Sequence, residues 1–242
     1  MNKLKCLTII QFFLFLQCIS NAQNLLKPEN IELKRNLIIA SHDFYKVTIF
    51  DSLGNKTGEL LNESTIKIDS LLGHIIFARF RQFPFGTHHI DTSIAKAIDL
   101  TPLQLKSFNK PLHKSLDVAF NKKTVKVHAF INGVQKDTVY NLEEGYFDDN
   151  TIEHLLGYFK LKKGETYRLN TFRYESAGNN PYECTYLFDD LLMAPNNTII
   201  KCAVVQFKNK YTNGYLWYEV STGRLLKEIG VSKNGSFLVV AN

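Results

Sequence analysis

Short runs of alternating apolar and polar residues follow one another along most of the chain. Residues 44–50 are rich in β-branched and aromatic side chains, and residues 65–69 alternate with period two. Turn residues separate such runs, as at 51–55 and at Asn132-Gly133, the strongest hairpin signal in the chain. We count roughly ten to twelve strands, with a turn signal about every 8–12 residues. This pattern predicts a mainly β fold, a large antiparallel sheet curled into a half-barrel or barrel.

One segment has helical rather than strand periodicity. Its apolar residues recur at positions i, i+3, i+4 and i+7, namely Ile152, Leu155, Leu156 and Phe159. Asn150 stands before this stripe and Glu153 follows three residues later, which is the spacing of a capping box. We therefore expect one short amphipathic helix from residue 151 to about 158–160. It must pack against the sheet, because a helix of this length is marginal on its own.

The first 22 residues have the organisation of a secretory signal peptide. Lys3 and Lys5 form a positively charged start, residues 7–16 a short apolar segment, and residues 20–22 a small-residue cleavage site. We therefore expect signal peptide 1–22 and a periplasmic or otherwise exported mature protein. Cys18 does not lie in a lipobox, because Gln17 stands where a very small residue is needed, so we expect no lipid anchor there.

Composition and charge narrow the class of protein further. Hydrophobic residues make up 45% and charged residues 21%, the balance of a globular domain rather than a disordered chain. No linker or repeat divides residues 23–242, so we expect a single β-rich domain. The net charge of +6 falls to +4 when the signal peptide takes away two lysines, which leaves 27 basic against 23 acidic residues. So mild a net charge does not indicate nucleic acid as a partner. The mature chain has no stretch of about 18 apolar residues, so we expect no transmembrane span in it.

Cys184 and Cys202 are the cysteines of the mature chain, and export would place them in an oxidising compartment. They lie nine residues on either side of Met193, where a turn over 193–196 is predicted. In an antiparallel hairpin centred there, the two would face each other at disulfide distance. A one-residue slip in register would separate them, so two buried free thiols are the alternative.

Signatures of catalysis and cofactor binding are missing from the sequence. It has no Walker A, GxGxxG, GxSxG or HExxH motif, and we expect no cofactor. The best metal candidates are His89 and Asp91, which would share one face of a strand, but a zinc site needs a third ligand that the sequence does not supply. A solvated strand face is therefore the stronger interpretation. Paired acids at 143–144, 148–149 and 189–190 could serve a glycosidase only if two carboxyls faced each other across a sugar, and at 148–149 they would also complement the helix dipole.

Aromatic residues are the more informative set, at 12% of the chain. Core packing is their ordinary role. A curved sheet with one short helix, however, has a concave face wider than the helix can cover, and leftover apolar surface there would form a ligand site. The residues that we expect to line such a site are Phe77, Phe80, Phe172, Tyr174 and Trp217.

Four segments together resemble a known family. They are an early Gly-turn hairpin (51–58), an aromatic-Asp lead into the short helix (146–159), a Lys-Gly turn into a Tyr-containing strand (163–167), and a Trp-containing strand with a Leu-Lys hairpin (216–227). The chain is similar to a bacterial family of exported proteins of unknown function, which looks like the curved half-barrel of the Lol-type lipoprotein carriers. The resemblance extends over most of residues 40–240, although residues 100–115 have no counterpart. It implies a half-barrel with a helix against its concave face and an apolar or lipid-like ligand.

Three functions follow as hypotheses. The first is a non-enzymatic protein of the cell envelope that binds an apolar small molecule, a lipid or a lipidated protein in a half-barrel cavity. The second is an envelope scaffold or interaction module with a filled core, and an apolar cavity of about 300 Å³ or more would favour the first over it. The third is a hydrolase built around His89, Asp91 or the paired acids, which requires at least three of these groups to converge in one cleft.

Overall fold

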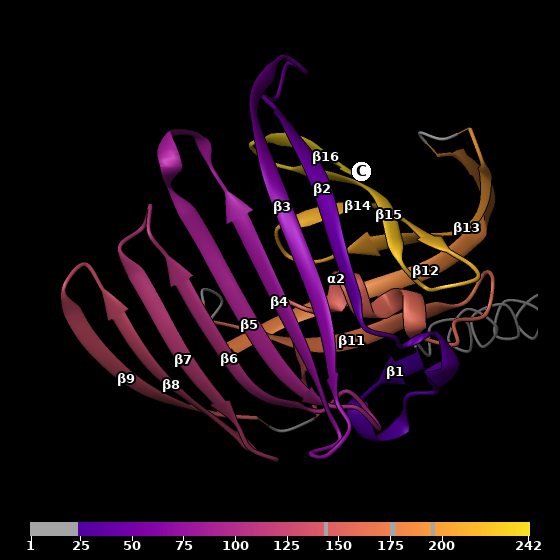
Figure 1. Cartoon of the computed structure of the whole chain (residues 1–242). Coiled ribbons are helices and arrows are strands. Elements are labelled where there is room, and N and C mark those ends of the chain that lie inside the picture. The colour runs from indigo at the N-terminus through magenta and orange to yellow at the C-terminus, as the bar shows by residue number, and fades with distance from the viewer. Residues whose placement is uncertain (1–23, 143–144, 175–177, 195–196) are drawn as a thin grey trace, which may run out of the picture.

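The chain folds into one 16-stranded sheet that curls around a short helix (Figure 1). The computed structural model describes residues 24–142, 145–174, 178–194 and 197–242. Each strand from β2 to β9 pairs antiparallel with the next one along the chain, and so does each strand from β11 to β16. The predicted mainly β fold, a large curled antiparallel sheet with one short helix, is confirmed.

We divide the sheet into two wings. The N-terminal wing consists of β2 (Ser41–Phe50), β3 (Lys56–Asp69), β4 (His74–Gln82), β5 (His88–Lys96), β6 (Pro102–Asn109), β7 (Lys114–Phe120), β8 (Thr124–Ile131) and β9 (Val134–Asn141). The C-terminal wing consists of β11 (Thr166–Arg173), β12 (Gly178–Met193), β13 (Ile199–Lys208), β14 (Thr212–Glu219), β15 (Leu225–Ser232) and β16 (Gly235–Ala241), with short β1 (Asn24–Leu26) and β10 (Phe147–Asp148) parallel to β11. The helical elements are η1 (Pro28–Asn30), η2 (Arg35–Leu37), η3 (Pro84–Gly86), α2 (Ile152–Leu155) and η4 (Leu156–Tyr158).

The two wings are joined where β16 pairs antiparallel with β2. Phe237 lies opposite Ile49 in this ladder, and Ala241 lies opposite Tyr45. The pairing makes one continuous sheet of the first long strand and the last, with β1 and β9 at its two edges. Figure 1 shows α2 lying between the wings, so the sheet is curled with the helix inside the curve.

The helical segment holds the wings together through an apolar core. Ile152, Leu155, Leu156 and Phe159 are all buried, which confirms the predicted apolar stripe. They share a cluster with side chains of both wings, which include Ile66 and Phe77 on one side and Phe207 and Leu216 on the other. Burial of such side chains stabilises by about 1.5–3 kcal/mol each, which a four-residue α-helix could not supply from its own hydrogen bonds.

The start of this helix differs from the prediction. Thr151 occupies the N-cap position, and no side chain caps the helix. Asn150, the predicted cap, instead accepts a hydrogen bond from Arg79 at 3.2 Å. The predicted box partner Glu153 does not reach back to the cap but lines the cavity described below. The capping prediction was wrong because tertiary contacts with β4 take the place of local capping.

The predicted disulfide is also wrong, since the two cysteines in the described part of the chain are free. The β12–β13 ladder ends at Met193 opposite Ile199, so the hairpin is centred three residues later than the prediction assumed. Cys184 therefore faces Phe207 across the ladder, and Cys202 faces Asp190. The two thiols also lie in different apolar clusters, Cys184 with the helix and Cys202 with Trp217.

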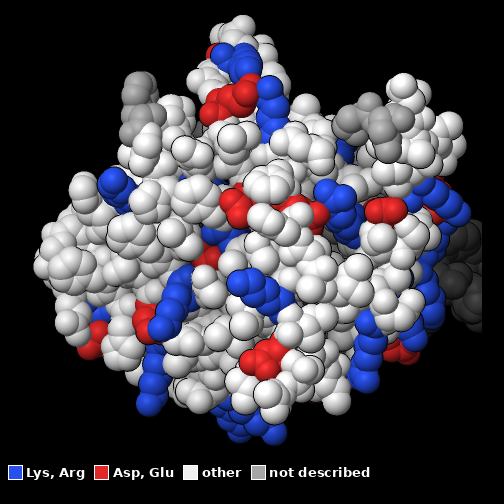
Figure 2. Space-filling view, viewed as in Figure 1, with Lys and Arg blue, Asp and Glu red and all other residues white. Residues whose placement is uncertain are grey.

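Two further predictions concern membranes and export. No helix in the described ranges has the length and apolar character that spanning a membrane requires. The predicted signal segment 1–22 and Cys18 lie outside the described residues. Charged side chains on the face shown in Figure 2 are interspersed, with wide uncharged areas between them.

Candidate functional site

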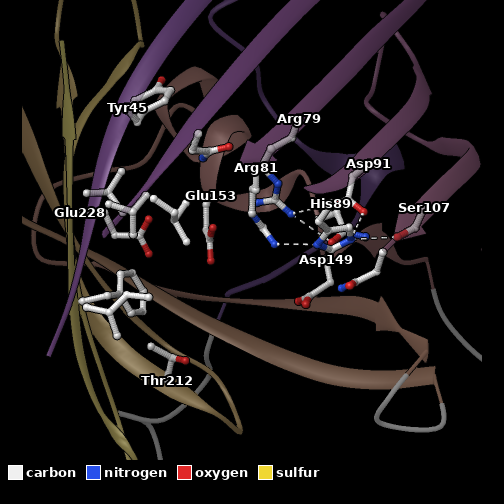
Figure 3. A pocket seen from close by; sticks show the side chains of 18 of the residues that line it. Tyr45, Arg79, Arg81, His89, Asp91, Ser107, Asp149, Glu153, Thr212 and Glu228 are labelled. Carbon is white, nitrogen blue, oxygen red and sulfur yellow. Dashed lines mark hydrogen bonds and ion pairs between the residues drawn. The ribbon is translucent and has the colours of Figure 1, made fainter. Parts of the chain in front are cut away.

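The inside of the curve contains a cavity of about 550 Å³. Residues of β2–β7 form one side of it, and residues of the α2 segment, β11, β14, β15 and β16 form the rest. The volume lies within the range that small-molecule sites occupy. Figure 3 shows the polar side chains that converge in it from both wings.

Strand register places two rows of polar residues across the concave face. Directly paired residues on neighbouring strands point to the same side of a sheet, so each row follows from the pairing. The first row runs from β2 to β7 through Tyr45, Asn62, Arg81, His89, Asn109 and Lys114. The second row, next to it and nearer the helix, runs from β3 to β6 through Ser64, Arg79, Asp91 and Ser107.

Asp91 is the most tightly held charge in these rows. Its Oδ2 lies 3.1 Å from Nη2 of Arg79, and its Oδ1 lies 3.0 Å from Nε2 of His89. The Asp91 and Arg79 side chains are only 4% and 10% exposed. Burial by itself would raise the pKa of Asp91, but the His89 hydrogen bond and the charges of Arg79 and Arg81 hold it well below its usual range. Asp91 is thus a fixed counter-ion for Arg79.

Arg81 lies two residues further along β4 and has no such counter-ion. Among the described residues, no carboxylate lies within ion-pair distance of its guanidinium, and its polar neighbour is Nδ1 of His89 at 3.3 Å from Nη1. Burial, together with the charge of Arg79, lowers the pKa of Arg81 to about 10. The group still carries its charge at neutral pH, so a half-buried positive charge faces the cavity without a carboxylate partner among the described residues.

Glu153 of α2 and Glu228 of β15 face the same space from the other side. Figure 3 shows both carboxyl groups extending into the cavity on one side of the Arg81 guanidinium. Burial raises the pKa of Glu153 and raises that of Glu228 well above its usual value. The charge of Asp149 adds to the rise at Glu153, and the charge of Glu153 adds to the rise at Glu228. Oε1 of the buried Glu228 has no hydrogen-bond partner in the described chain. The site therefore disfavours the ionised form of both glutamates beside a charged arginine.

The remaining titratable groups of the site are either paired or neutral. Asp149 accepts hydrogen bonds from Thr171 and Asn180, both at 2.8 Å, and lies 3.4 Å from Nη1 of Arg173. Burial, and then the charges of the two β4 arginines, lower the pKa of His154 to about 3, so its ring is neutral at physiological pH.

Apolar side chains cover the part of the cavity that lies beyond the first polar row. In the register, Val47 pairs with Val239 and Leu60, which places these three on the side of the row toward the β2–β3 turn. We call this part the apolar rim, formed by Val47, Ile49, Leu60, Phe83, Phe237 and Val239. Glu228 lies opposite Val239, beside this rim, and polar residues of the β15–β16 hairpin line the same end of the cavity. The cavity is thus amphipathic, with the two arginines next to the helix and an apolar strip on β2, β3 and β16 toward the β2–β3 turn.

The aromatic residues singled out in the sequence divide between three places. Phe172 and Tyr174, on and just after β11, line the cavity. Phe77 is buried in the core beneath the cavity, among residues that pack on the helix, so its predicted place in the lining was wrong. Phe80 and Trp217 line neither the cavity nor that core.

Phe80 and Trp217 lie on the outer side of the sheet because neighbouring residues on a strand alternate between its faces. Phe80 stands between two inward-facing arginines, and its ring stacks on that of His88 at 5.9 Å between centroids. The indole N–H of Trp217 donates to Asp190 at 2.9 Å, and Lys227 lies over the ring at 4.6 Å. Their predicted place in the cavity was therefore wrong.

His89 and Asp91 do share one face of β5, as predicted. The described residues contain no group of three or more His, Cys, Asp or Glu arranged to hold a metal ion. The neighbours of this pair across the sheet are instead Arg81 and Arg79. A cation site is disfavoured there, because the positive guanidinium groups already fill it.

Sequence reasoning missed the arginine pair and the two glutamates. Arg79 and Arg81 were hidden inside a run that reads as an ordinary apolar strand, and Glu228 stands in a similar run. The signal that could have found them is the period-two match between Arg79-x-Arg81 and His89-x-Asp91 on consecutive predicted strands. Glu153 was seen, but was assigned to helix capping.

The fold and the site together define a β-barrel-like protein with an amphipathic internal cavity. A family model described as a protein of unknown function, DUF3108, matches residues 63–230, and the chain belongs to this family. The chain is also similar to the crystal structure of a β-barrel-like protein of a domain of unknown function, DUF1849, from Brucella abortus. The TM-score is 0.59 at 11% identity, over 85% of this chain and 96% of that one, so the likeness is one of fold. No curated protein matches the chain.

Proposed function

We propose that this is an exported, non-enzymatic protein of the cell envelope that binds an apolar or lipid-like molecule in the cavity inside its curled sheet. The observation that supports this most directly is the cavity itself. At about 550 Å³ it exceeds the 300 Å³ or so that separates a small-molecule site from a packed core. Its rim consists of apolar side chains on strands of both wings, which is the lining that a hydrocarbon chain needs.

Export is the second part of the proposal and rests on the sequence alone. Residues 1–22 combine a positively charged start, an apolar segment and a small-residue cleavage site. The cell envelope contains lipids and lipidated proteins, so the expected compartment supplies ligands of the kind that the cavity suits. The predicted likeness to Lol-type lipoprotein carriers would add a lipid-anchored protein to the candidate cargo.

The scaffold hypothesis fits the cavity less well. A protein that acts only through its edges and loops has no need of an unfilled interior, and an empty apolar volume destabilises a fold. The exposed edge strand β9 could still pair with another chain, but that role does not explain the cavity.

A hydrolase has one observation in its favour, because His89, Asp91 and Asp149 do converge in one cavity. Oγ of Ser107 also lies 3.1 Å from Nε2 of His89. In a Ser-His-Asp triad, however, the serine and the aspartate bind opposite ring nitrogens, and here both contact Nε2. Since Arg81 can only donate, Nδ1 must accept, so Nε2 carries the hydrogen and donates it to Ser107 Oγ, and it cannot take a proton from Ser107.

Native mass spectrometry of purified residues 23–242, followed by solvent extraction, tests the proposed function. The expected result is a stoichiometric lipid or other apolar adduct, which extraction removes and identifies. A clean apo mass that does not change after incubation with envelope lipids would contradict the proposal. Nitrophenyl esters of several chain lengths test the hydrolase in parallel, since only that hypothesis predicts turnover that Ser107→Ala abolishes.

A further inference from the structure

We propose that the ligand is an amphipathic anion, a hydrocarbon chain that ends in a carboxylate or phosphate group, with its anionic end on Arg81 and its chain along the apolar rim. This inference rests on the proposed function and names the class of ligand. It follows from three observations on the cavity, which are the state of Arg81, the balance of the charges around it and the order of the surfaces along the sheet.

The first observation is that Arg81 lacks a counter-ion where its neighbour has one. Asp91 binds Arg79 and His89 and so has no oxygen directed at Arg81. A guanidinium taken from water without an anion is costly, and an arriving anion would remove that cost. The planar fork of an arginine matches a carboxylate or phosphate in particular, because two N–H groups can donate in parallel.

The second observation is the balance of charge around that guanidinium. The charged and titratable groups that face the cavity come from β2, β4, β5, β7, the α2 segment, β11 and β15, and they are Tyr45, Arg79, Arg81, His89, Asp91, Lys114, Asp149, Glu153, His154, Arg173 and Glu228. Asp91 pairs with Arg79, and Asp149 pairs with Arg173, so these four charges cancel. Burial disfavours a negative charge on Glu153 and on Glu228, and in its protonated form each can donate a hydrogen bond to an oxygen of the ligand. The positive groups of the cavity outside these two ion pairs are Arg81 and Lys114, which stand in the same polar row, and Arg81 is the one next to the glutamates.

The third observation is the order of surfaces along the sheet. The row that contains Arg81 lies between the second polar row, next to the helix, and the apolar rim, toward the β2–β3 turn. An anionic group on Arg81 would therefore leave a chain only one apolar direction to follow, along Val47 and Leu60 toward Phe237. A ligand with a head group but no chain would leave the apolar rim exposed to water. A neutral hydrocarbon would leave Arg81 without a counter-ion.

A set of ligands with one chain and different head groups tests this inference on the mature chain. Tetradecanoate, tetradecyl phosphate, tetradecanol and tetradecyltrimethylammonium would compete with the neutral fluorescent probe N-phenylnaphthylamine, below the concentrations at which they aggregate. We expect each anion to displace the probe at a concentration about tenfold lower than the alcohol does, which corresponds to about 1.4 kcal/mol. The cationic ligand should be the weakest of the four.

Arg81→Gln is the decisive variant, because glutamine keeps a polar side chain without the charge. It should abolish the preference for the anions, so that anions and alcohol displace the probe at similar concentrations, while Arg168→Gln, at an exposed arginine of β11, serves as the matched control and keeps the preference. Equal binding of alcohol and acid by the unmutated protein would overturn the inference and leave the proposed function standing. Tighter binding of the cation would overturn it in favour of the acidic groups. Failure of the probe and of all four ligands to bind would contradict the proposed function itself.

Discussion

Arg79 and Arg81 point to the same side of β4, two residues apart, yet only Arg79 has a carboxylate partner. A fold that needed both charges for stability would supply an acid for each. This asymmetry gives Arg79 a structural role and leaves Arg81 available to bind an anion from outside the chain. It also predicts opposite effects on stability when the charge of Arg81 is removed and when the charge of Asp91 is removed.

Removal of the Arg81 charge should stabilise the ligand-free protein. Arg81→Gln takes away a half-buried charge that has no counter-ion, and we expect the free energy of unfolding to rise by about 1 kcal/mol. Urea unfolding of the delipidated protein measures it, with Arg168→Gln as the control. Loss of stability in Arg81→Gln would mean that the native chain neutralises this group after all.

Removal of the Asp91 charge should do the reverse. Asp91→Asn leaves Arg79 and His89 without their anion in a buried place, and we expect a loss of about 3 kcal/mol. The matched control is Asp117→Asn, which breaks the largely exposed pair of Asp117 with Lys106 and should leave the unfolding midpoint unchanged. Similar losses in both variants would show that the buried position of Asp91 does not matter.

Titration of Asp148 should make the free energy of unfolding depend on pH. This residue accepts a hydrogen bond from Ser93 beneath the helix, and burial raises its pKa to about 7. The native state therefore holds a proton that the unfolded state releases near pH 4, so the free energy of unfolding falls as pH rises from about 4 to about 7. Asp148→Asn should flatten that part of the curve in urea titrations. An unchanged slope would show that Asp148 titrates as an exposed acid does.

A bulky side chain in the apolar rim should block the ligand. Leu60 lines the cavity, whereas the next residue, Leu61, points outward and is 55% exposed. We expect Leu60→Trp to weaken probe binding by at least about tenfold, since about 1.4 kcal/mol of apolar contact is easily lost, and Leu61→Trp to leave it unchanged. Fluorescence titration checks both variants, and equal behaviour of the two would place the ligand elsewhere.

Alkylation should find both cysteines unbridged. Burial raises the pKa of the Cys184 thiol to about 12, so it should react with iodoacetamide only after unfolding. Mass spectrometry of protein produced in an oxidising compartment should then show two added groups on residues 184 and 202. A mass two hydrogens short, with no alkylation, would contradict the register of the β12–β13 hairpin.

The sequence was sufficient to predict the fold class and the helix, because both depend on local patterns. Alternation and turns such as Asn132-Gly133 specify strands directly, and the stripe from Ile152 to Phe159 specifies a buried helical face. Which side of a strand faces inward depends on register, and a shift of one residue reverses it. That is why Phe172 was placed in the cavity correctly and Phe80 was not.

The charged part of the site was harder to predict for a related reason. Arg81 and Glu228 are far apart in the chain and line the same cavity only because β16 pairs with β2 and closes the curve. No local pattern records that closure. The cysteine prediction failed for a more local reason: a hairpin centre three residues away separates Cys184 and Cys202 along the strands, and the irregularity between Tyr186 and Phe188 turns them to opposite faces.

The pairing of β16 with β2 also bears on the order in which parts of the chain fold during synthesis. Val239 of β16 lies opposite Val47 of β2, so one wall of the cavity can form only after β16 has been synthesised. The meander from β2 to β9 can form as it leaves the ribosome, because each of its pairings is local, whereas this one spans nearly the whole chain. The cavity therefore comes into existence last, and a chain cut short before β16 would have its arginines in place but no enclosed site for them to serve.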